Sequence, residues 1–174
     1  DPMSCEIDTT FDMRSDTPAG KDPDTFSPTL RRYHRCLWSK PLPDGTMFEL
    51  DGSGPRTRYL HHRSARGEFF LASDTIIHTY SYWLKMRPIT DQIPEDEKEA
   101  FRSAGYTIGG MTVFHGNSID RKRTINGARG MSPKIADRFD LTLESIRRHY
   151  LGEPSPLSEV LARYDDFFRL FRSF

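Results

Sequence analysis

Five apolar side chains between residues 135 and 150 recur at helical spacing, and this stripe constrains the fold more than any other stretch. Steps of three and four residues keep them on one face of an α-helix. Ser132 and Pro133 supply a cap and a first-turn proline, and Gly152 with Pro154 ends the pattern. The sequence therefore predicts a core-facing helix over residues 133–150. The stripe consists of Ile135, Phe139, Leu143, Ile146 and Tyr150.

A basic segment leads into this predicted helix. Residues 121–138 carry six basic side chains and one acidic side chain. Free amides at a helix N-terminus and nearby glycines bind phosphates well, and cations beside them add to the attraction. We therefore predict an anion site at a glycine-flanked loop and the helix start. Its expected ligand residues are Arg121, Lys122, Arg123, Arg129, Gly130, Lys134 and Arg138. The opposing interpretation is that these cations pair with the acidic N-terminal segment or stay solvated.

The composition is that of one globular domain. The 174 residues are formally neutral, with 36% hydrophobic and 29% charged residues. No apolar run approaches the roughly 18–20 residues that span a bilayer, and no basic and then apolar leader begins the chain. We therefore predict a cytoplasmic protein without membrane contact. Cys5 and Cys36 lack metal-ligand spacing, so we expect neither a disulfide nor a bound metal, and we predict no cofactor.

The chain divides into an acidic segment and a folded unit. Residues 1–28 carry seven acidic and two basic side chains with little apolar periodicity, which predicts an irregular segment. Residues 29–174 are expected to form one α+β domain. Strands at 59–62, 68–72 and 106–114 predict a small antiparallel sheet packed against three to four helices. Gly109 and Gly110 interrupt the third strand, where a bend or a passing ligand is needed.

Two further helices are expected before the third strand, and one short helix near residue 30. Residues 30–38 place Leu30 and Trp38 on an apolar face, with His34 among the arginines of a cationic face. Such basic and aromatic interleaving suits phosphates and stacked bases, or simply an amphipathic helix. Ser73 and Asp74 are expected to cap a helix ended by Pro88. An acidic surface helix follows from Pro94.

The last predicted helix carries a heavy apolar face up to Phe174. Such a face packs on the domain, pairs with a second subunit as a homodimer, or covers a segment that follows. The sequence leaves these alternatives open.

Three histidines are candidate proton carriers: His61, His62 and His115. Because neighbouring residues of a strand point to opposite faces, His61 and His62 are not expected to chelate one metal.

Several long strings resemble a family of bacterial proteins classed as a domain of unknown function, among them YTIGGMTVFHGN, TINGARG and KIADRFDLTLESIRRHY. The resemblance covers nearly the whole chain and implies no activity, cofactor or catalytic residue. Members of that family continue past the equivalent of Phe174, which implies a truncated or processed chain here.

The preferred functional prediction is binding of a phosphorylated small molecule, either a nucleotide or a sugar phosphate. One alternative is a hydrolase or transferase acting on such a ligand, and another is a protein-interaction module using the last helix. A neutral chain with a pI near 7.2 lacks the basic footprint of a duplex-DNA binder, so nucleic acid is the less favoured partner. Whether the chain is an enzyme stays open.

Overall fold

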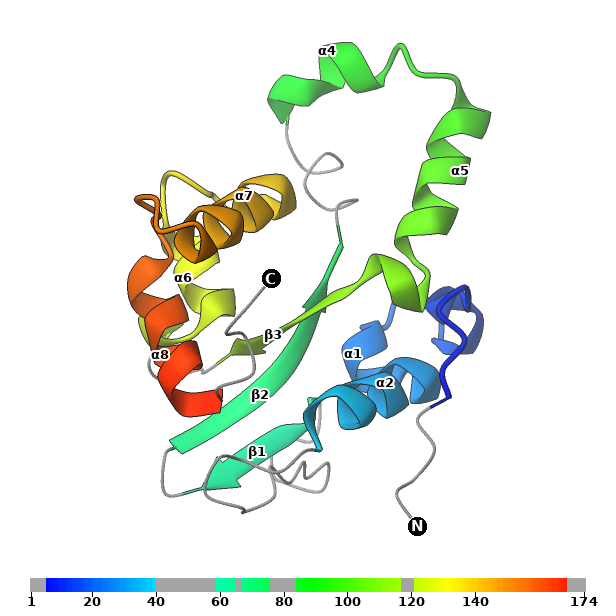
Figure 1. Ribbon diagram of the computed structural model, residues 1–174. Coiled ribbons are helices and arrows are strands. Elements are labelled where there is room, and N and C mark those ends of the chain that lie inside the picture. The colour runs from blue at the N-terminus through cyan, green and yellow to red at the C-terminus, as the bar shows by residue number, and fades with distance from the viewer. Residues whose placement is uncertain (1–5, 40–58, 65–66, 76–83, 117–120, 169–174) are drawn as a thin grey trace.

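A three-stranded antiparallel sheet forms the centre of the molecule (Figure 1). The computed structural model describes residues 6–39, 59–64, 67–75, 84–116 and 121–168. The strands β1 (His61–Ser64), β2 (Gly67–Asp74) and β3 (Thr112–Gly116) are adjacent in chain order. Phe70 of β2 lies opposite His61 on one side and Gly116 on the other. The predicted α+β class with a small antiparallel sheet is confirmed.

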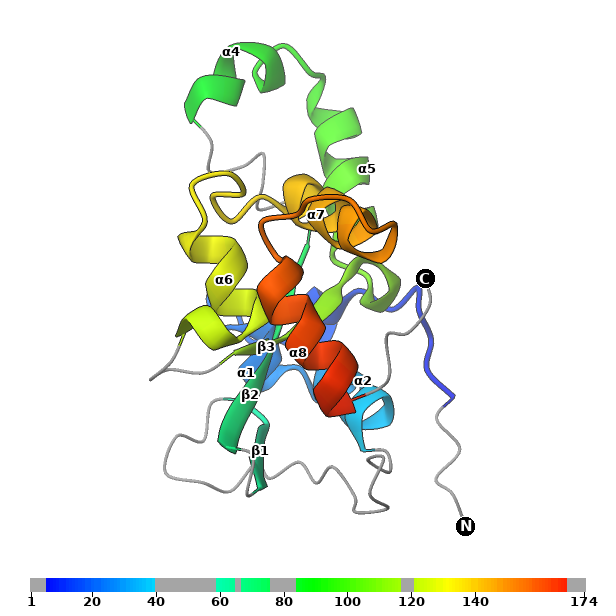
Figure 2. The same ribbon diagram turned by 60° about the vertical axis from the view of Figure 1, so that its left-hand side comes forward.

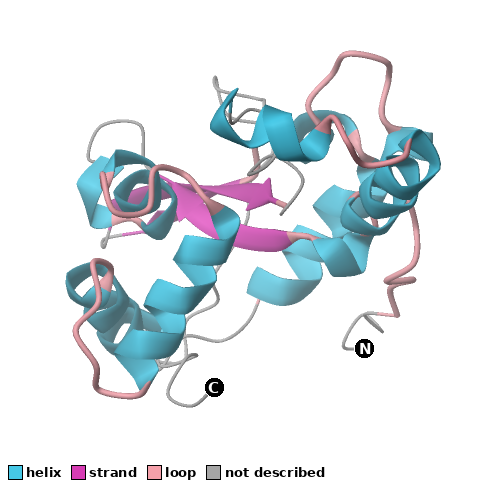
Figure 3. Ribbon diagram, turned by 90° about the horizontal axis from the view of Figure 1, so that it is seen from above, coloured by secondary structure: helices cyan, strands magenta, loops and turns pink. Residues whose placement is uncertain are grey.

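Helices cover both faces of this sheet (Figures 1 and 3). Partners across antiparallel strands share a face, so Leu71 and His115 point one way and Ala72 and Phe114 the other. On the first face lie α1 (Pro23–Phe26) and α2 (Pro28–Trp38), with the Trp38 and His115 ring centroids 4.1 Å apart. On the second face, α6 (Ile125–Met131) packs on β3, and α7 (Phe139–Tyr150) and α8 (Ser158–Phe168) complete the layer.

Two apolar clusters form the core. The larger joins the sheet to α6, α7 and α8 through Trp38, Leu71, Phe114, Ile125, Ile135, Ile146, Leu157, Val160 and Leu161. The smaller holds the N-terminal segment through Met13, Leu30 and Ile108. Backbone hydrogen bonds from Met13 to Tyr106 and from Ile108 to Phe11 tie that segment down. This segment contains η1 (Met13–Asp16) and α1, and Asp12 forms an isolated β-bridge with Thr107.

The helix predicted over residues 133–150 starts later than expected. The TINGARG stretch is itself the helix α6 rather than a loop, and α7 begins only at Phe139. Ala136 and Asp137 between them have φ values of 51° and 62°, which end one helix before the next begins. Ile135 is buried from this turn, whereas Leu143 of the predicted stripe is 40% exposed. The far end is as predicted, because Gly152 has a φ of 73° beyond the last turn.

The cap predicted at Ser73 and Asp74 is wrong, because both residues belong to β2. Residues 76–83 of the expected helix lie outside the described residues. Beyond them, η2 (Leu84–Met86) leads into the short α4 (Arg87–Thr90), which contains Pro88 rather than ending before it. The predicted acidic helix is present as α5 (Glu95–Gly105). Figures 1 and 2 show α4 and α5 extending away from the sheet.

The glycine pair in the predicted third strand forms a bend, η3 (Ile108–Gly110), and β3 starts after it. A Cβ atom on Gly110 would lie 2.7 Å from the carbonyl oxygen of Ala104 and 2.8 Å from that of Gly105. The close approach that requires glycine here is therefore made by the chain's own backbone.

Cys36 is disulfide-bonded, so the expectation of unpaired cysteines is wrong for this residue. Its potential partner Cys5 lies outside the described residues. The same holds for the side chain of His62 and for the side chains from residue 164 onward, which carry the proposed dimer face of α8.

Candidate functional site

The predicted anion-site residues are distributed around α6 rather than gathered at one point. Lys122 and Arg123 precede α6 and are exposed, and Lys134 is exposed in the turn after it. The 7 residues of α6 separate these two groups by about 10 Å along the helix axis. Gly130 is exposed near the end of α6, and the side chain of Arg121 lies outside the described part of the chain. The exposed cations thus lie at opposite ends of one short helix.

Arg129 extends from α6 into the interior, where its side chain is 1% exposed. Its Nε donates to Thr142 at 2.9 Å, and Nη1 donates to Asp137 Oδ1 at 2.6 Å. Its Nη2 lies 2.6 Å from the Asp74 carboxylate and donates to the Asp137 carbonyl at 2.9 Å. The guanidinium carbon lies 5.1 Å from the centroid of the Phe114 ring. All three guanidinium nitrogens are therefore bound within the chain, joining α6, β2 and α7.

Arg138 precedes α7 and is paired with Asp140 in its first turn. The Arg138 Nε donates to Asp140 Oδ1 at 3.1 Å. Burial raises the pKa of Asp140, but hydrogen bonds from Arg138 and the Leu141 amide outweigh it and hold that pKa below its usual value. The anion that the sequence pattern calls for at this helix start is therefore present as the chain's own carboxylate. Ligand binding by these residues stays a prediction.

The histidines predicted as proton carriers do not share a site. His61 is buried on β1, and its pairing with Phe70 sets it on the same face of the sheet as that ring. His115 is buried on β3 and precedes Gly116, which pairs with Phe70. Because neighbouring residues of a strand point to opposite faces, His115 lies on the face opposite to Phe70. The two rings are therefore separated by the sheet.

A different polar cluster lies under α2, where Ser73, His34 and Asp24 meet. The Ser73 Oγ and His34 Nε2 atoms are 2.7 Å apart, and the Ser73 amide donates to Asp24 Oδ2 at 2.7 Å. The other Asp24 oxygen lies 3.5 Å from the same His34 nitrogen. Asp24 is 6% exposed and His34 is fully buried, whereas Ser73 is partly exposed. The cluster joins α1, α2 and β2.

Burial shifts both ionisable groups of this cluster. Desolvation raises the pKa of Asp24 to about 7, against the opposing hydrogen bonds from Ser73. Desolvation also lowers the pKa of His34 to about 3, helped by the positive charges of Arg31 and Arg35. The imidazole is therefore neutral at neutral pH, while the carboxyl group is close to half-ionised. Strongly displaced pKa values cluster at functional sites, and buried structural networks produce them as well.

Two buried atoms of this cluster have no hydrogen-bond partner among the described residues, namely His34 Nδ1 and Asp24 Oδ1. Most buried polar atoms in folded proteins are hydrogen-bonded, so these two require a physical explanation. The cluster therefore combines two unsatisfied buried atoms with two displaced pKa values.

The sequence contained signals for this cluster. His34 follows Leu30 by four residues and precedes Trp38 by four, so it lies in the buried stripe of α2 rather than on the cationic face predicted for it. Ser73 follows the core residue Leu71 by two along a strand, which puts both on one face. The Asp24 carboxylate had no such signal, because it reaches the cluster only through the packing of α1 against β2.

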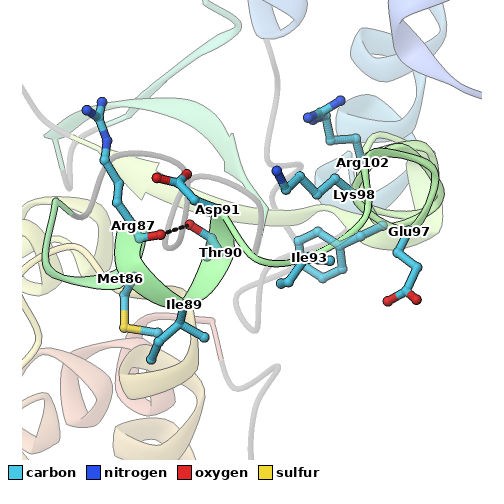
Figure 4. A pocket seen from close by; sticks show the side chains of 10 residues that line it. Met86, Arg87, Ile89, Thr90, Asp91, Ile93, Glu97, Lys98 and Arg102 are labelled. Atoms are coloured by element: carbon cyan, nitrogen blue, oxygen red, sulfur yellow. Dashed lines mark hydrogen bonds between the residues drawn. The ribbon is translucent and has the colours of Figure 1, made fainter.

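A groove of about 590 Å³ lies between α4 and α5 (Figure 4). Ile89, Ile93 and Phe101 form much of its apolar lining and are 61%, 37% and 43% exposed. Figure 4 shows Lys98 pointing from α5 toward α4, and Arg87 on the opposite side of α4 from Ile89. This volume lies within the range of about 300–1,000 Å³ that is typical of ligand pockets.

Comparison with known proteins adds one assignment. A model for a family of unknown function matches residues 7–174, nearly the whole chain. The chain belongs to this family, DUF6994. The resemblance to a domain of unknown function is thereby confirmed. No curated protein and no solved structure matches this DUF6994 chain.

Two features are missing from the described part of this DUF6994 chain. None of its helices is long and apolar enough to cross a membrane. Nor do the described histidine, cysteine and acidic side chains form any group of three that could hold a metal ion.

Proposed function

We propose that this DUF6994 chain binds a phosphorylated small molecule, and specifically a nucleotide, in the groove between α4 and α5. The observation that carries the proposal is a groove of about 590 Å³ with an apolar lining, three basic side chains and two acidic ones. An aromatic side chain, Phe101, offers a surface on which a base stacks. A sugar phosphate, which has no apolar face of that size, suits this lining less well.

The basic side chains at the groove differ in their ion pairs, which favours Arg87 as the contact to a phosphate. Lys98 pairs with Glu95 at 3.3 Å, and Arg102 pairs with both Glu95 and Glu99 at 2.8 and 2.9 Å. Arg87 is exposed and has no ion pair among the described residues. Its guanidinium is therefore available for a bidentate contact with a phosphate.

A thermal-shift titration with nucleotides and the matching nucleosides tests this proposal. A nucleotide raises the melting temperature and a nucleoside does so less. Arg87→Gln should weaken nucleotide binding by about tenfold or more, because a hydrogen bond to a charged group contributes about 1.5–3 kcal/mol. Arg163→Gln on α8 is the control, since the Arg163 side chain is 40% exposed, pairs with Glu159 and lies away from the groove lining. No shift with any nucleotide overturns the proposal.

The basic residues flanking α6 are a second candidate for the same ligand class. Lys122 and Lys134 are exposed and have no ion pair among the described residues. Binding there should weaken steeply with salt and be lost in Lys122→Gln or Lys134→Gln, with Arg87→Gln unaffected. The opposite result assigns the ligand to the groove.

The interaction alternative draws less support. Leu157 just before α8 and Val160 and Leu161 in its first turns are buried in the main core, so this part of its apolar face already packs on the domain.

A further inference from the structure

We propose that Ser73 is a catalytic nucleophile whose proton is taken by His34, in a site that transfers the acyl group of a small anionic ester. The geometry that points to this is the 2.7 Å contact between Ser73 Oγ and His34 Nε2, held at the junction of α1, α2 and β2. The site uses none of the residues of the nucleotide groove, so the two proposals stand or fall separately.

The first requirement is a nucleophile and a base in hydrogen-bond reach, with the nucleophile open to a substrate. The Ser73 hydroxyl meets the distance criterion, and its residue is partly exposed while His34 is fully buried. The Ser73 amide is fixed by Asp24 at 2.7 Å, which limits movement of the strand at this residue. The Ser73 backbone is therefore fixed, which keeps its hydroxyl close to His34.

The second requirement is a base that is unprotonated at neutral pH. Burial and the charges of Arg31 and Arg35 lower the pKa of His34 to about 3, so its imidazole is unprotonated at neutral pH, although the low pKa also makes it a weak base. The Asp24 carboxylate lies 3.5 Å from the same nitrogen and stabilises the imidazolium once it forms. Asp24 is thus a positioning residue, and it differs from the usual triad carboxylate in approaching Nε2 rather than Nδ1.

The unsatisfied atoms support a reactive role. A cluster serving only to clamp α2 to the sheet gains most when every buried polar atom is bonded. Here His34 Nδ1 and Asp24 Oδ1 have no hydrogen-bond partner among the described residues. Each unsatisfied atom costs free energy that a purely structural cluster would avoid.

The reaction needs only the ester and one water molecule as reactants. Ser73 Oγ forms a bond to the ester carbonyl carbon as its proton passes to His34 Nε2. The carbon–oxygen bond to the alcohol then breaks, and the leaving alkoxide takes that proton. Water repeats the sequence on the acyl-serine, so that a carboxylic acid leaves and the serine is restored.

The cations of α2 favour a negatively charged substrate. Arg31 and Arg35 lie one turn apart on α2, beside the buried stripe that holds His34, and their positive charges act on its imidazole. Arg31 also donates to the Asp24 carbonyl at 3.3 Å, which places a guanidinium beside the cluster. An ester with a carboxylate or phosphate on its acyl group is attracted by both charges.

A fluorophosphonate probe on the full chain tests the nucleophile. Ser73 Oγ displaces fluoride from phosphorus, and peptide mass spectrometry of the wild-type protein locates the adduct. We expect the label on Ser73, its loss in Ser73→Ala, and labelling at least about 100-fold slower in His34→Gln. Ser15→Ala is the matched control, because the exposed Ser15 hydroxyl only donates to the Asp12 carbonyl. No label, or a label on another residue, overturns the proposal even if a variant fails to fold.

The substrate class is tested on the wild type with 4-nitrophenyl acetate and 4-nitrophenyl hemisuccinate. The anionic hemisuccinate should show a KM about tenfold lower. Equal KM values would overturn the anionic-ester assignment and leave the nucleophile in place.

Discussion

Two adjacent residues of β2, Ser73 and Asp74, point to opposite faces of the sheet and enter two very different buried clusters. On the Asp74 face, every guanidinium nitrogen of Arg129 is bound to the chain. On the Ser73 face, His34 and Asp24 each keep a buried atom without a hydrogen bond among the described residues. Similar burial thus accompanies complete satisfaction on one face and incomplete satisfaction on the other.

The difference follows from donor and acceptor geometry. A guanidinium offers five donors in a fixed plane, and the oxygens of Asp74, Asp137 and Thr142 surround it. An imidazole offers two nitrogens on opposite sides of the ring, and both Ser73 and Asp24 approach the same one. The first arrangement is suited to holding three elements together, and the second to moving a proton.

The largest predicted effect is that of replacing Arg129, which tests whether the cluster on the Asp74 face is structural. Arg129→Met should lower the free energy of unfolding by about 3–5 kcal/mol, because it leaves the Asp74 carboxylate in the interior without its charge partner. Urea denaturation monitored by circular dichroism measures this loss. Arg147→Met on α7 is the control, since Arg147 is half exposed and its pair with Glu144 is a surface one worth about 0–1 kcal/mol. Equal losses in the two variants would show that the Arg129 cluster is not structural.

The ionisable groups on the Ser73 face should instead make the free energy of unfolding depend on pH. The pKa of Asp24 is raised from 3.8 to about 7 on folding, so its contribution to stability is present below about pH 4 and lost as pH rises toward 7. The pKa of His34 is lowered from 6.5 to about 3, so its contribution is present above about pH 6.5 and lost as pH falls toward 3. Between about pH 4 and 6.5 the folded and unfolded pairs each hold one proton, and the two slopes largely cancel.

Single variants should separate these slopes. In Asp24→Asn only His34 remains, and the free energy of unfolding should rise with pH between pH 4.5 and 6. In His34→Gln only Asp24 remains, and it should fall over the same interval. Each slope is at most about 1.4 kcal/mol per pH unit. Urea titrations at several pH values measure both, and slopes of the same sign would contradict the assignment of the proton to Asp24 in the folded state.

Much of the fold could be predicted because local patterns fix it. The acidic first turn of α5, the apolar run Phe69–Leu71 in β2 and the glycine after α7 all point to the observed elements. The start of α7 could not be found, because Ala136 and Asp137 adopt positive φ values, which are unusual for alanine and uncommon even for aspartate. Such turns are set by tertiary contacts, here the hydrogen bonds that Arg129 makes to Asp137.

The sequence does not predict the cluster of Ser73, His34 and Asp24, for a related reason. Six basic residues in one segment suggested a common ligand, but burial of Arg129 and pairing of Arg138 depend on carboxylates that the sequence gives no reason to prefer. Proximity of Asp24 to Ser73 spans 49 residues and arises only from packing. The pattern of charged residues therefore identifies the basic segment, but it does not identify the carboxylates with which Arg129 and Arg138 pair.

A smaller effect is expected when one donor of Arg129 loses its acceptor. Thr142→Val keeps the shape but leaves the Arg129 Nε hydrogen unbound in the interior, which should cost about 1–3 kcal/mol. Ser145→Ala on the same helix is the control, because the Ser145 hydroxyl only donates to the Leu141 carbonyl within α7. Urea denaturation compares the two, and a loss no greater than that of the control would mean that Nε is satisfied otherwise.

The smallest effect is expected where the basic segment meets solvent. Lys122→Gln and Lys134→Gln should each change the free energy of unfolding by less than about 0.5 kcal/mol, because both side chains are exposed and form no ion pair among the described residues. Their mild effect beside that of Arg129→Met would divide one basic segment into a structural residue and residues available to a ligand. A loss above about 1 kcal/mol in either lysine variant would instead assign that lysine to the structure.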